Sequence, residues 1–224
     1  MSIKALIPVR SGSQRVANKN IKPFAGSSLL EIKVKQLLRL PELDGVVVNS
    51  NSDEMLEIAH SLGAETVKRD EYFATSSVSM NEVYQNMAEN MDCDTILFAD
   101  ATNPLILDET ISNVIRQWQN IDSQYDSIAT VHSIKEFLWL NGRALNYDPD
   151  NKPRSQDLPN IQALNYAVHI LPRELMIQKR DIIGHQPKFV EIAEIEATDI
   201  DTPSDFAFAE FAFLNNFNKI KWGG

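Results

Sequence analysis

A loop rich in cations follows the first apolar run of the chain. Residues 3–9 are mostly apolar, and residues 10–20 hold three cations, a glycine and small polar residues, namely Arg10, Gly12, Ser13, Arg15, Lys19 and Asn20. A polyanion such as a triphosphate requires fixed positive charge and backbone N–H groups that it can approach closely. The loop is neither a Walker A loop nor a G-x-G-x-x-G fingerprint, which argues against kinases, GTPases and NAD enzymes. Its alternative interpretation is a solvated polar loop without a ligand.

A pair of acidic residues lies near the other end of the chain. Asp199 and Asp201 are separated by one residue, and on an extended backbone such side chains project to the same side. Both carboxylates can then reach one divalent cation, and oxygen ligands select Mg²⁺ or Mn²⁺. Alternatively, the pair only compensates the positive end of the helix that follows.

The first half of the chain alternates short apolar runs with helical patterns. We expect strands at residues 3–9, 45–49, 65–68 and 95–99 and helices after Ser28, after Ser52, around residues 80–91 and at 109–121. This alternation predicts an α/β fold with a mostly parallel sheet, Rossmann-like and three-layered. Ligands of such sheets lie at the carboxyl ends of the strands, which is where residues 10–20 begin.

The second half of the chain interrupts this rhythm. A strand is expected at residues 126–131, but Asn141-Gly142 is a hairpin signal and several prolines follow it. We therefore predict an antiparallel insertion at about 132–162 within one domain that spans 1–224. The sheet resumes at 163–170 and 189–193, and Thr202-Pro203 starts a final helix that is rich in phenylalanine.

Charge and cysteine content exclude several classes of protein. The formal net charge is −10, which argues against a nucleic-acid binder or a protein that binds anionic membranes. Residues 1–40 are an exception, with eight Lys and Arg residues and one acidic residue; three of these, Lys33, Lys35 and Arg39, are expected on the solvent face of the first helix. Cys93 is the only cysteine, and no membrane span or signal peptide is evident. We expect a cytoplasmic protein.

Four motifs in order resemble the acylneuraminate cytidylyltransferases. They are Arg10 to Gly26 (RSGSQRVANKNIKPFAG), Pro153 to Pro159 (PRSQDLP), Asn165 to Ile170 (NYAVHI) and Asp199 to Thr202 (DIDT). The resemblance covers nearly the full chain. It implies a nucleotidyltransferase fold and an Mg²⁺-dependent reaction of CTP with a nonulosonic sugar acid, which gives the CMP-sugar and pyrophosphate. It also implies a homodimer in which the insertion is a dimerisation arm that helps to complete the partner's sugar pocket.

The resemblance also assigns roles to single residues. Arg10 and Lys19 would hold the triphosphate and Asn20 the nucleotide, while Arg15 would replace a lysine usual at the position of Gln14. Gly12 and Ser13 belong to the same nucleotide-binding loop, and Arg69 and Ser79 match the segment around the cytosine. Arg154 matches an arginine that contacts the sugar acid, and Asp199 and Asp201 match a metal-binding pair. Catalysis would then rest on Arg10, Lys19 and Asp201.

Three departures from the family pattern cluster on the sugar side. Asp100 stands where glutamine is common, Tyr166 interrupts the usual Asn-Gly-Ala, and Ala163 stands where an arginine is common. The sugar site would comprise Asp100, Arg154, Asn165 and His169, although the position of His169 between Val168 and Ile170 favours the core slightly over the pocket. A legionaminate-type or pseudaminate-type substrate fits these changes. Two other functions stay open, a nucleotide-sugar-dependent glycosyltransferase and a CTP-binding homologue without catalysis.

Overall fold

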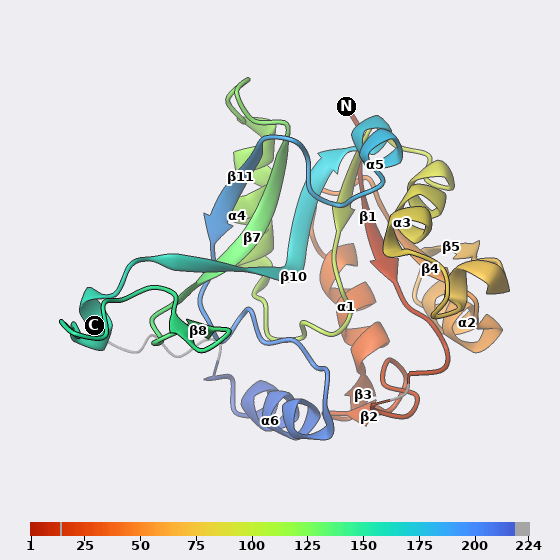
Figure 1. The fold of residues 1–224 in the computed structure, drawn as a ribbon. Coiled ribbons are helices and arrows are strands. Elements are labelled where there is room, and N and C mark those ends of the chain that lie inside the picture. Colours follow the sequence, from red (N-terminus) through yellow and green to blue (C-terminus); the bar gives the residue numbers. More distant parts are fainter. Residues whose placement is uncertain (14, 218–224) are drawn as a thin grey trace.

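A seven-stranded sheet forms the centre of the computed structural model, which describes residues 1–13 and 15–217 (Figure 1). Gln14 lies outside the described residues. The strand order is β11-β7-β10-β6-β1-β4-β5, with bounds β1 (Ile3–Pro8), β4 (Gly45–Ser50), β5 (Glu65–Lys68), β6 (Thr95–Phe98), β7 (Ser127–Ile134), β10 (Ile161–Pro172) and β11 (Pro187–Glu191). Within the described part of this sheet, β10 alone runs antiparallel to its neighbours. The sheet is thus mostly parallel, as predicted, and the α/β class is confirmed.

Helices cover both faces of the sheet. Apolar side chains of α1 (Leu29–Leu38), α2 (Asp53–Ser61) and α4 (Asp108–Gln119) share one core cluster, and those of α3 (Met80–Glu89) and α5 (Arg173–Lys179) share the other. The last helix, α6 (Pro203–Leu214), packs on the short hairpin of β2 (Pro23–Phe24) and β3 (Ser27–Ser28) through Phe24 and Phe206, whose ring centroids are 5.3 Å apart. None of the helices in the described ranges is long and apolar enough to cross a membrane.

Local sequence signals set the helix starts. The Ser28 hydroxyl accepts a hydrogen bond from the backbone N–H of Glu31 at the start of α1. At α6 the hydroxyl of Thr202 and the carboxylate of Asp205 each accept from the other's backbone N–H, and Pro203 occupies the first turn. Such caps satisfy N–H groups that have no partner within the helix, and both predicted starts are confirmed.

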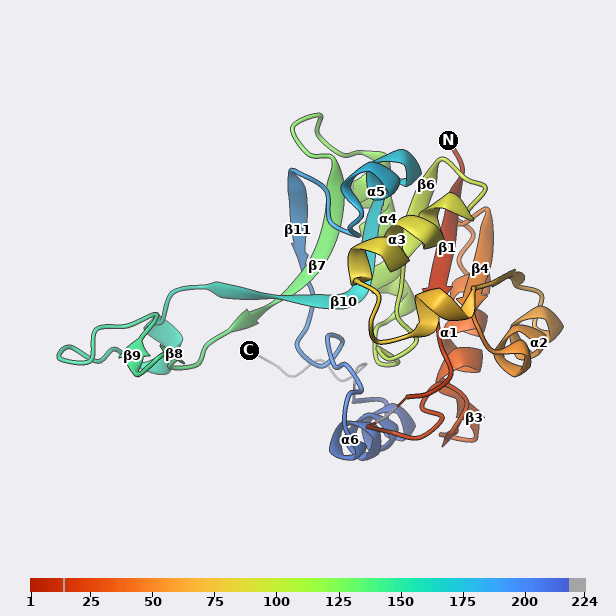
Figure 2. The ribbon, with the colours of Figure 1, turned by 45° about the vertical axis from the view of Figure 1, so that its right-hand side comes forward.

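The strands β7 and β10 continue beyond the sheet into an arm. Figure 2 shows this arm projecting from the body, with β8 (Trp139–Leu140) and β9 (Arg143–Ala144) at its tip. The predicted hairpin is present, since Asn141 and Gly142 connect β8 to β9 with φ of 51° and 76°, the positive values that a tight turn of this type requires. A single-turn helix, η2 (Ser155–Asp157), precedes β10.

One prediction about a helix face is wrong. Lys33 is fully buried, although it was expected on the solvent face of α1, because its ammonium finds buried oxygen acceptors. Met80 is 54% exposed at the start of α3, whereas Val83 and Met87 pack into the core.

Candidate functional site

A cavity of about 690 Å³ opens at the carboxyl ends of β1, β5 and β6. Its walls come from the loop after β1, the segment from η1 (Glu71–Ala74) into α3, the loop after β6 and the segment before α6. Nine of the predicted site residues line it, namely Arg10, Ser13, Arg15, Lys19, Asn20, Arg69, Asp100, Asp199 and Asp201. The topology thus brings together residues that lie up to 191 positions apart in the printed sequence.

The basic loop and the acidic pair meet directly in this cavity. A guanidinium nitrogen of Arg15 lies 2.7 Å from Oδ1 of Asp201, and Nζ of Lys19 lies 3.7 Å from the same oxygen. Lys19 also donates to the backbone carbonyl of Ile200. Cations that would contact a triphosphate therefore stand beside carboxylates that would hold a divalent cation.

Two further arginines face the cavity from neighbouring segments. Arg10 donates through Nη1 to the carbonyl of Ala74, at 2.8 Å. Arg69 is buried, and its Nε and Nη2 donate to the side-chain and backbone oxygens of Asn49, at 2.6 and 2.9 Å. Burial, with a smaller contribution from the charge of Arg10, lowers the pKa of Arg69 to about 10. Arg69 stays positively charged at neutral pH and is held in one orientation.

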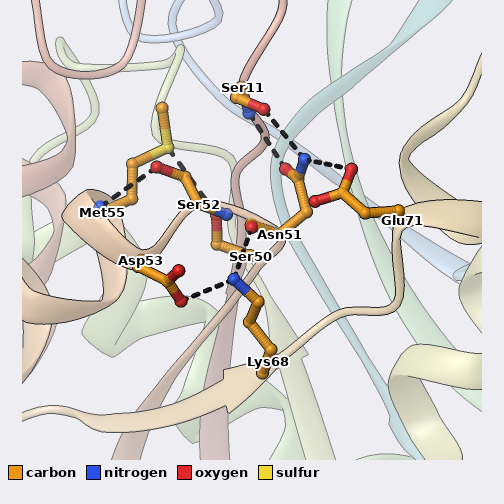
Figure 3. A network of polar contacts seen from close by, with 8 residues as sticks. All are labelled: Ser11, Ser50, Asn51, Ser52, Asp53, Met55, Lys68 and Glu71. Carbon is orange, nitrogen blue, oxygen red and sulfur yellow. Dashed lines mark hydrogen bonds and ion pairs between the residues drawn. The ribbon is translucent and has the colours of Figure 1, made fainter.

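A polar network centred on Asn51 holds the loop after β1 (Figure 3). The side-chain amide of Asn51 donates to the Ser11 hydroxyl at 2.8 Å and to Glu71 at 3.1 Å, and its carbonyl oxygen accepts from the Ser11 backbone N–H at 3.1 Å. Lys68 binds the backbone carbonyl of Asn51 and the carboxylate of Asp53. Asn51 was not predicted, although its place directly after β4, at the same sheet edge, was a usable signal.

The residues around Asp199 fit a divalent cation. Asp199 Oδ1 is buried without a hydrogen-bond partner, while the Thr102 hydroxyl contributes a hydrogen bond to the same carboxylate. Burial, and then the neighbouring Asp201, raise the pKa of Asp199. No group of three or more His, Cys, Asp or Glu side chains in the described ranges is arranged to hold a metal. Mg²⁺ is usually bound by one or two carboxylates, and substrate phosphate oxygens and water complete its coordination sphere.

Asp100 lies at a more apolar end of the same cavity. Burial raises the pKa of Asp100 to about 7, and the charge of Asp199 adds to this effect. Tyr84, Phe98 and Tyr166 surround this end, with the rings of Tyr84 and Phe98 edge to face at 5.7 Å. These aromatic residues were not predicted as site residues, because an aromatic residue in a strand or helix is most often part of the core.

Four predicted residues of the body lie outside the cavity lining. Gly12 has a φ of 76° and allows the loop to turn, and Ser79 caps α3 by accepting from the N–H of Glu82. Asn165 is buried and accepts from the Thr130 hydroxyl at 2.6 Å. His169 is fully buried, with Nε2 2.9 Å from the carbonyl oxygen of Asn165, and burial lowers the pKa of His169 to about 4.

Arg154 lies on the arm, away from the cavity. Its guanidinium pairs with Asp157 at 2.7 Å, and its side chain is 72% exposed. The cavity of one chain therefore does not contain Arg154, because η2 and the arm project from the body (Figure 2).

Comparison with known proteins places the chain among enzymes that use CTP. The family model described as "Cytidylyltransferase" matches residues 4–210. The pseudaminic acid cytidylyltransferase of Campylobacter jejuni is 25% identical over 222 residues, which cover 94% of this chain and 96% of that protein. The CMP-N,N'-diacetyllegionaminic acid synthase of Legionella pneumophila is 26% identical and covers 94% of this chain and 95% of its own length.

Two further relatives extend the comparison. The N-acylneuraminate cytidylyltransferase of Oncorhynchus mykiss is 27% identical over 93% of this chain, which spans only 49% of that longer protein. Among solved structures, a CMP:2-keto-3-deoxy-manno-octonic acid synthetase complexed with CTP superimposes with a TM-score of 0.70 at 15% identity, covering 96% of this chain and all of the other. That structural likeness supports the fold alone. The family match supports the resemblance seen in the sequence: the chain belongs to the cytidylyltransferase family.

Proposed function

We propose that this chain transfers the cytidylyl group of CTP to the anomeric hydroxyl of a nonulosonic acid. The observation that carries the proposal is the meeting of Arg15 and Lys19 with Asp201 in one cavity at the carboxyl edge of the sheet. Nucleotidyl transfer requires cations for the phosphates and carboxylates for a divalent cation at the same place. The names of the bacterial relatives support a sugar acid as the acceptor.

The reaction consists of one in-line displacement. The sugar hydroxyl oxygen forms a bond to the α-phosphorus, and the bond from that phosphorus to the bridging oxygen of the β-phosphate breaks. Pyrophosphate leaves with the bridging oxygen, and the hydroxyl proton passes to solvent water. Arg10, Arg15 and Lys19 would contact the phosphate oxygens. In the free chain Arg10 donates to Ala74, Arg15 to Asp201 and Lys19 to Ile200. These hydrogen bonds already hold the three cations at the cavity wall. Preorganised charges of this kind stabilise the transition state without being reoriented.

Asp199 and Asp201 would hold Mg²⁺, for which Mn²⁺ is a substitute. The orphaned Oδ1 of Asp199 supports this assignment. When bound, the ion neutralises charge on the phosphate oxygens.

Arg69 would contact the cytosine. Its bonds to Asn49 use Nε and Nη2 and leave Nη1 for an acceptor on the base. A guanidinium that is already oriented loses little entropy when it binds.

The sugar site would be completed by a second copy of the chain. Large apolar side chains on the arm are exposed, with Trp139, Leu140 and Leu145 each 57–59% accessible. Exposed apolar residues grouped on a projecting element are typical of interaction surfaces. We expect a homodimer in which Arg154 pairs bidentately with the sugar carboxylate in the partner's cavity, a geometry that arginine provides better than lysine.

Pyrophosphate release tests the proposal. Purified protein with Mg²⁺ and CTP is assayed against a panel of sugar acids, with UTP and ATP as nucleotide controls and the Asp199→Asn variant as the protein control. We expect release that depends on both CTP and one sugar acid and that EDTA and the variant abolish. CTP binding without release across the panel would contradict the enzymatic proposal, and sugar transfer without pyrophosphate would support a glycosyltransferase.

A further inference from the structure

Lys33 is a buried cation that neither the family comparison nor the proposed mechanism uses. Its side chain is 0% exposed on α1. Its ammonium donates to Gln36 Oε1 and to the backbone carbonyl of Asn103, both at 3.0 Å, and forms no ion pair within the described part of the chain. Burial lowers the pKa of Lys33 to about 7, against the attraction of Asp100 and Asp108. Burying an ammonium without a paired charge is costly, and the two hydrogen bonds of Lys33 offset part of that cost.

Asn103 links the loop after β6 to the segment before α6. Its backbone N–H donates to the carbonyl of Asp100 at 3.4 Å and closes a turn. Its side-chain amide donates to the carbonyl of Thr198 at 3.0 Å. The N–H of Ile200 in turn donates to the carbonyl of Thr102, at 3.0 Å. These bonds join the turn that carries Asp100 to the backbone on either side of Asp199.

A second side chain of α1 fixes the far end of the same loop. Nε2 of Gln36 donates to the carbonyl of Ile106 at 2.7 Å and to Asp108 at 2.9 Å, and its Oε1 accepts from Lys33. The loop between β6 and α4 is thus held to α1 at two points. Lys33 provides the point nearer to the cavity.

We propose that Lys33 is a positioning residue, whose hydrogen bond to the Asn103 carbonyl fixes the distance between the Asp100 turn and the Asp199 segment. The Lys33 nitrogen carries N–H donors in its charged and in its neutral form, so this hydrogen bond persists although burial disfavours the charge. The effect on catalysis rests on the proposed function; the effect on the backbone does not.

Hydrogen exchange and steady-state kinetics test this role together. Lys33→Met removes both the charge and the donor, Lys33→Gln keeps an amide donor, and Lys35→Met is the control because Lys35 lies two residues later with a half-exposed side chain. In Lys33→Met we expect exchange at the amides of Asn103 and Ile200 to be about tenfold faster, and kcat to fall about tenfold with KM for CTP within about twofold of the wild-type value. In Lys33→Gln both the exchange rates and kcat should lie closer to the wild-type values, and Lys35→Met should change neither the exchange rates nor kcat.

Other outcomes would overturn the proposal. Unchanged exchange at the amides of Asn103 and Ile200 in both Lys33 variants would contradict it. A uniform loss of protection over the whole chain would also contradict it, because it would show that Lys33 contributes only to general packing. If Lys33→Met does not fold, the comparison of Lys33→Gln with the wild-type protein decides on the same two amides. If the wild-type protein shows no turnover with any sugar acid, the proposed function fails while the exchange measurement still decides the role of Lys33.

Discussion

Replacing Asp201 with asparagine separates catalysis from stability. The side chains of Arg15 and Asp201 are 66% and 45% exposed, and an exposed ion pair contributes about 0–1 kcal/mol. Only the backbone N–H of Asp201 takes part in the cap of α6, where it donates to Asp205. We therefore expect Asp201→Asn to lower the melting temperature by less than about 4 °C.

The same change has opposite effects on turnover and on metal-free nucleotide binding. Loss of one of two metal-binding carboxylates should lower kcat by about 10²-fold or more, as for the loss of other electrostatic groups in active sites. Without Mg²⁺, Arg15 and Lys19 no longer share their charge with a carboxylate. One unit charge at about 6 Å in water is worth about 0.7 kcal/mol, so CTP should bind about threefold more tightly.

Three measurements check this prediction on one protein preparation. They are thermal unfolding, pyrophosphate release at saturating CTP, and calorimetric titration with CTP in EDTA. A control, Glu174→Gln, breaks the ion pair with Arg173, which lies outside the cavity lining, and should leave kcat unchanged. Turnover of Asp201→Asn within about threefold of the wild-type value, or weaker CTP binding in EDTA, would refute the reasoning.

Three further predictions concern single residues. His169 has a pKa of about 4 in the folded chain against an ordinary value of 6.5, so stability is fully present above pH 6.5 and falls by up to about 3 kcal/mol toward pH 4; His169→Gln should flatten this dependence in urea titrations, and an unchanged slope would contradict it. The pKa of Asp100 is raised from 3.8 to about 7, so its burial costs stability progressively as the pH rises from 3.8 to 7. In EDTA at pH 8, Asp100→Asn should be more stable by up to about 4 kcal/mol in urea unfolding, whereas a less stable variant would show that the carboxylate is favourably paired. Equal amounts of Arg154→Ala and Asp201→Asn, each inactive alone, should regain about a quarter of the wild-type activity after mixing, because a heterodimer contains one intact site; no recovery despite exchange of subunits would place Arg154 outside the partner's cavity.

Local signals made much of the fold predictable. Ser28 and Thr202 cap helices through bonds within their own turn, and Asn141-Gly142 needs only its own backbone to form a hairpin. The basic loop could be placed at the ligand edge because it directly follows a strand. The family resemblance then added the pairing of this loop with the acidic segment.

Other features depend on contacts that no local pattern contains. Lys33 is buried because the carbonyl of Asn103, 70 residues away, accepts a hydrogen bond from its side-chain nitrogen. Ser79 was expected near the nucleotide but caps a helix, since both roles use the same kind of residue at the same place. The antiparallel direction of β10 likewise follows from the path of the arm, which the strand's own sequence does not encode.

The reaction product tests the central claim most directly. The protein, Mg²⁺, CTP and the accepted sugar acid are incubated in ¹⁸O-enriched water, in which the anomeric hydroxyl carries the label, and the products are followed by ³¹P NMR. The proposed displacement predicts a CMP-sugar whose phosphorus signal is shifted by one bridging ¹⁸O, together with unlabelled pyrophosphate. A CMP-sugar with an unlabelled bridge, or free CMP as the only new nucleotide, would contradict attack by the sugar hydroxyl on the α-phosphorus.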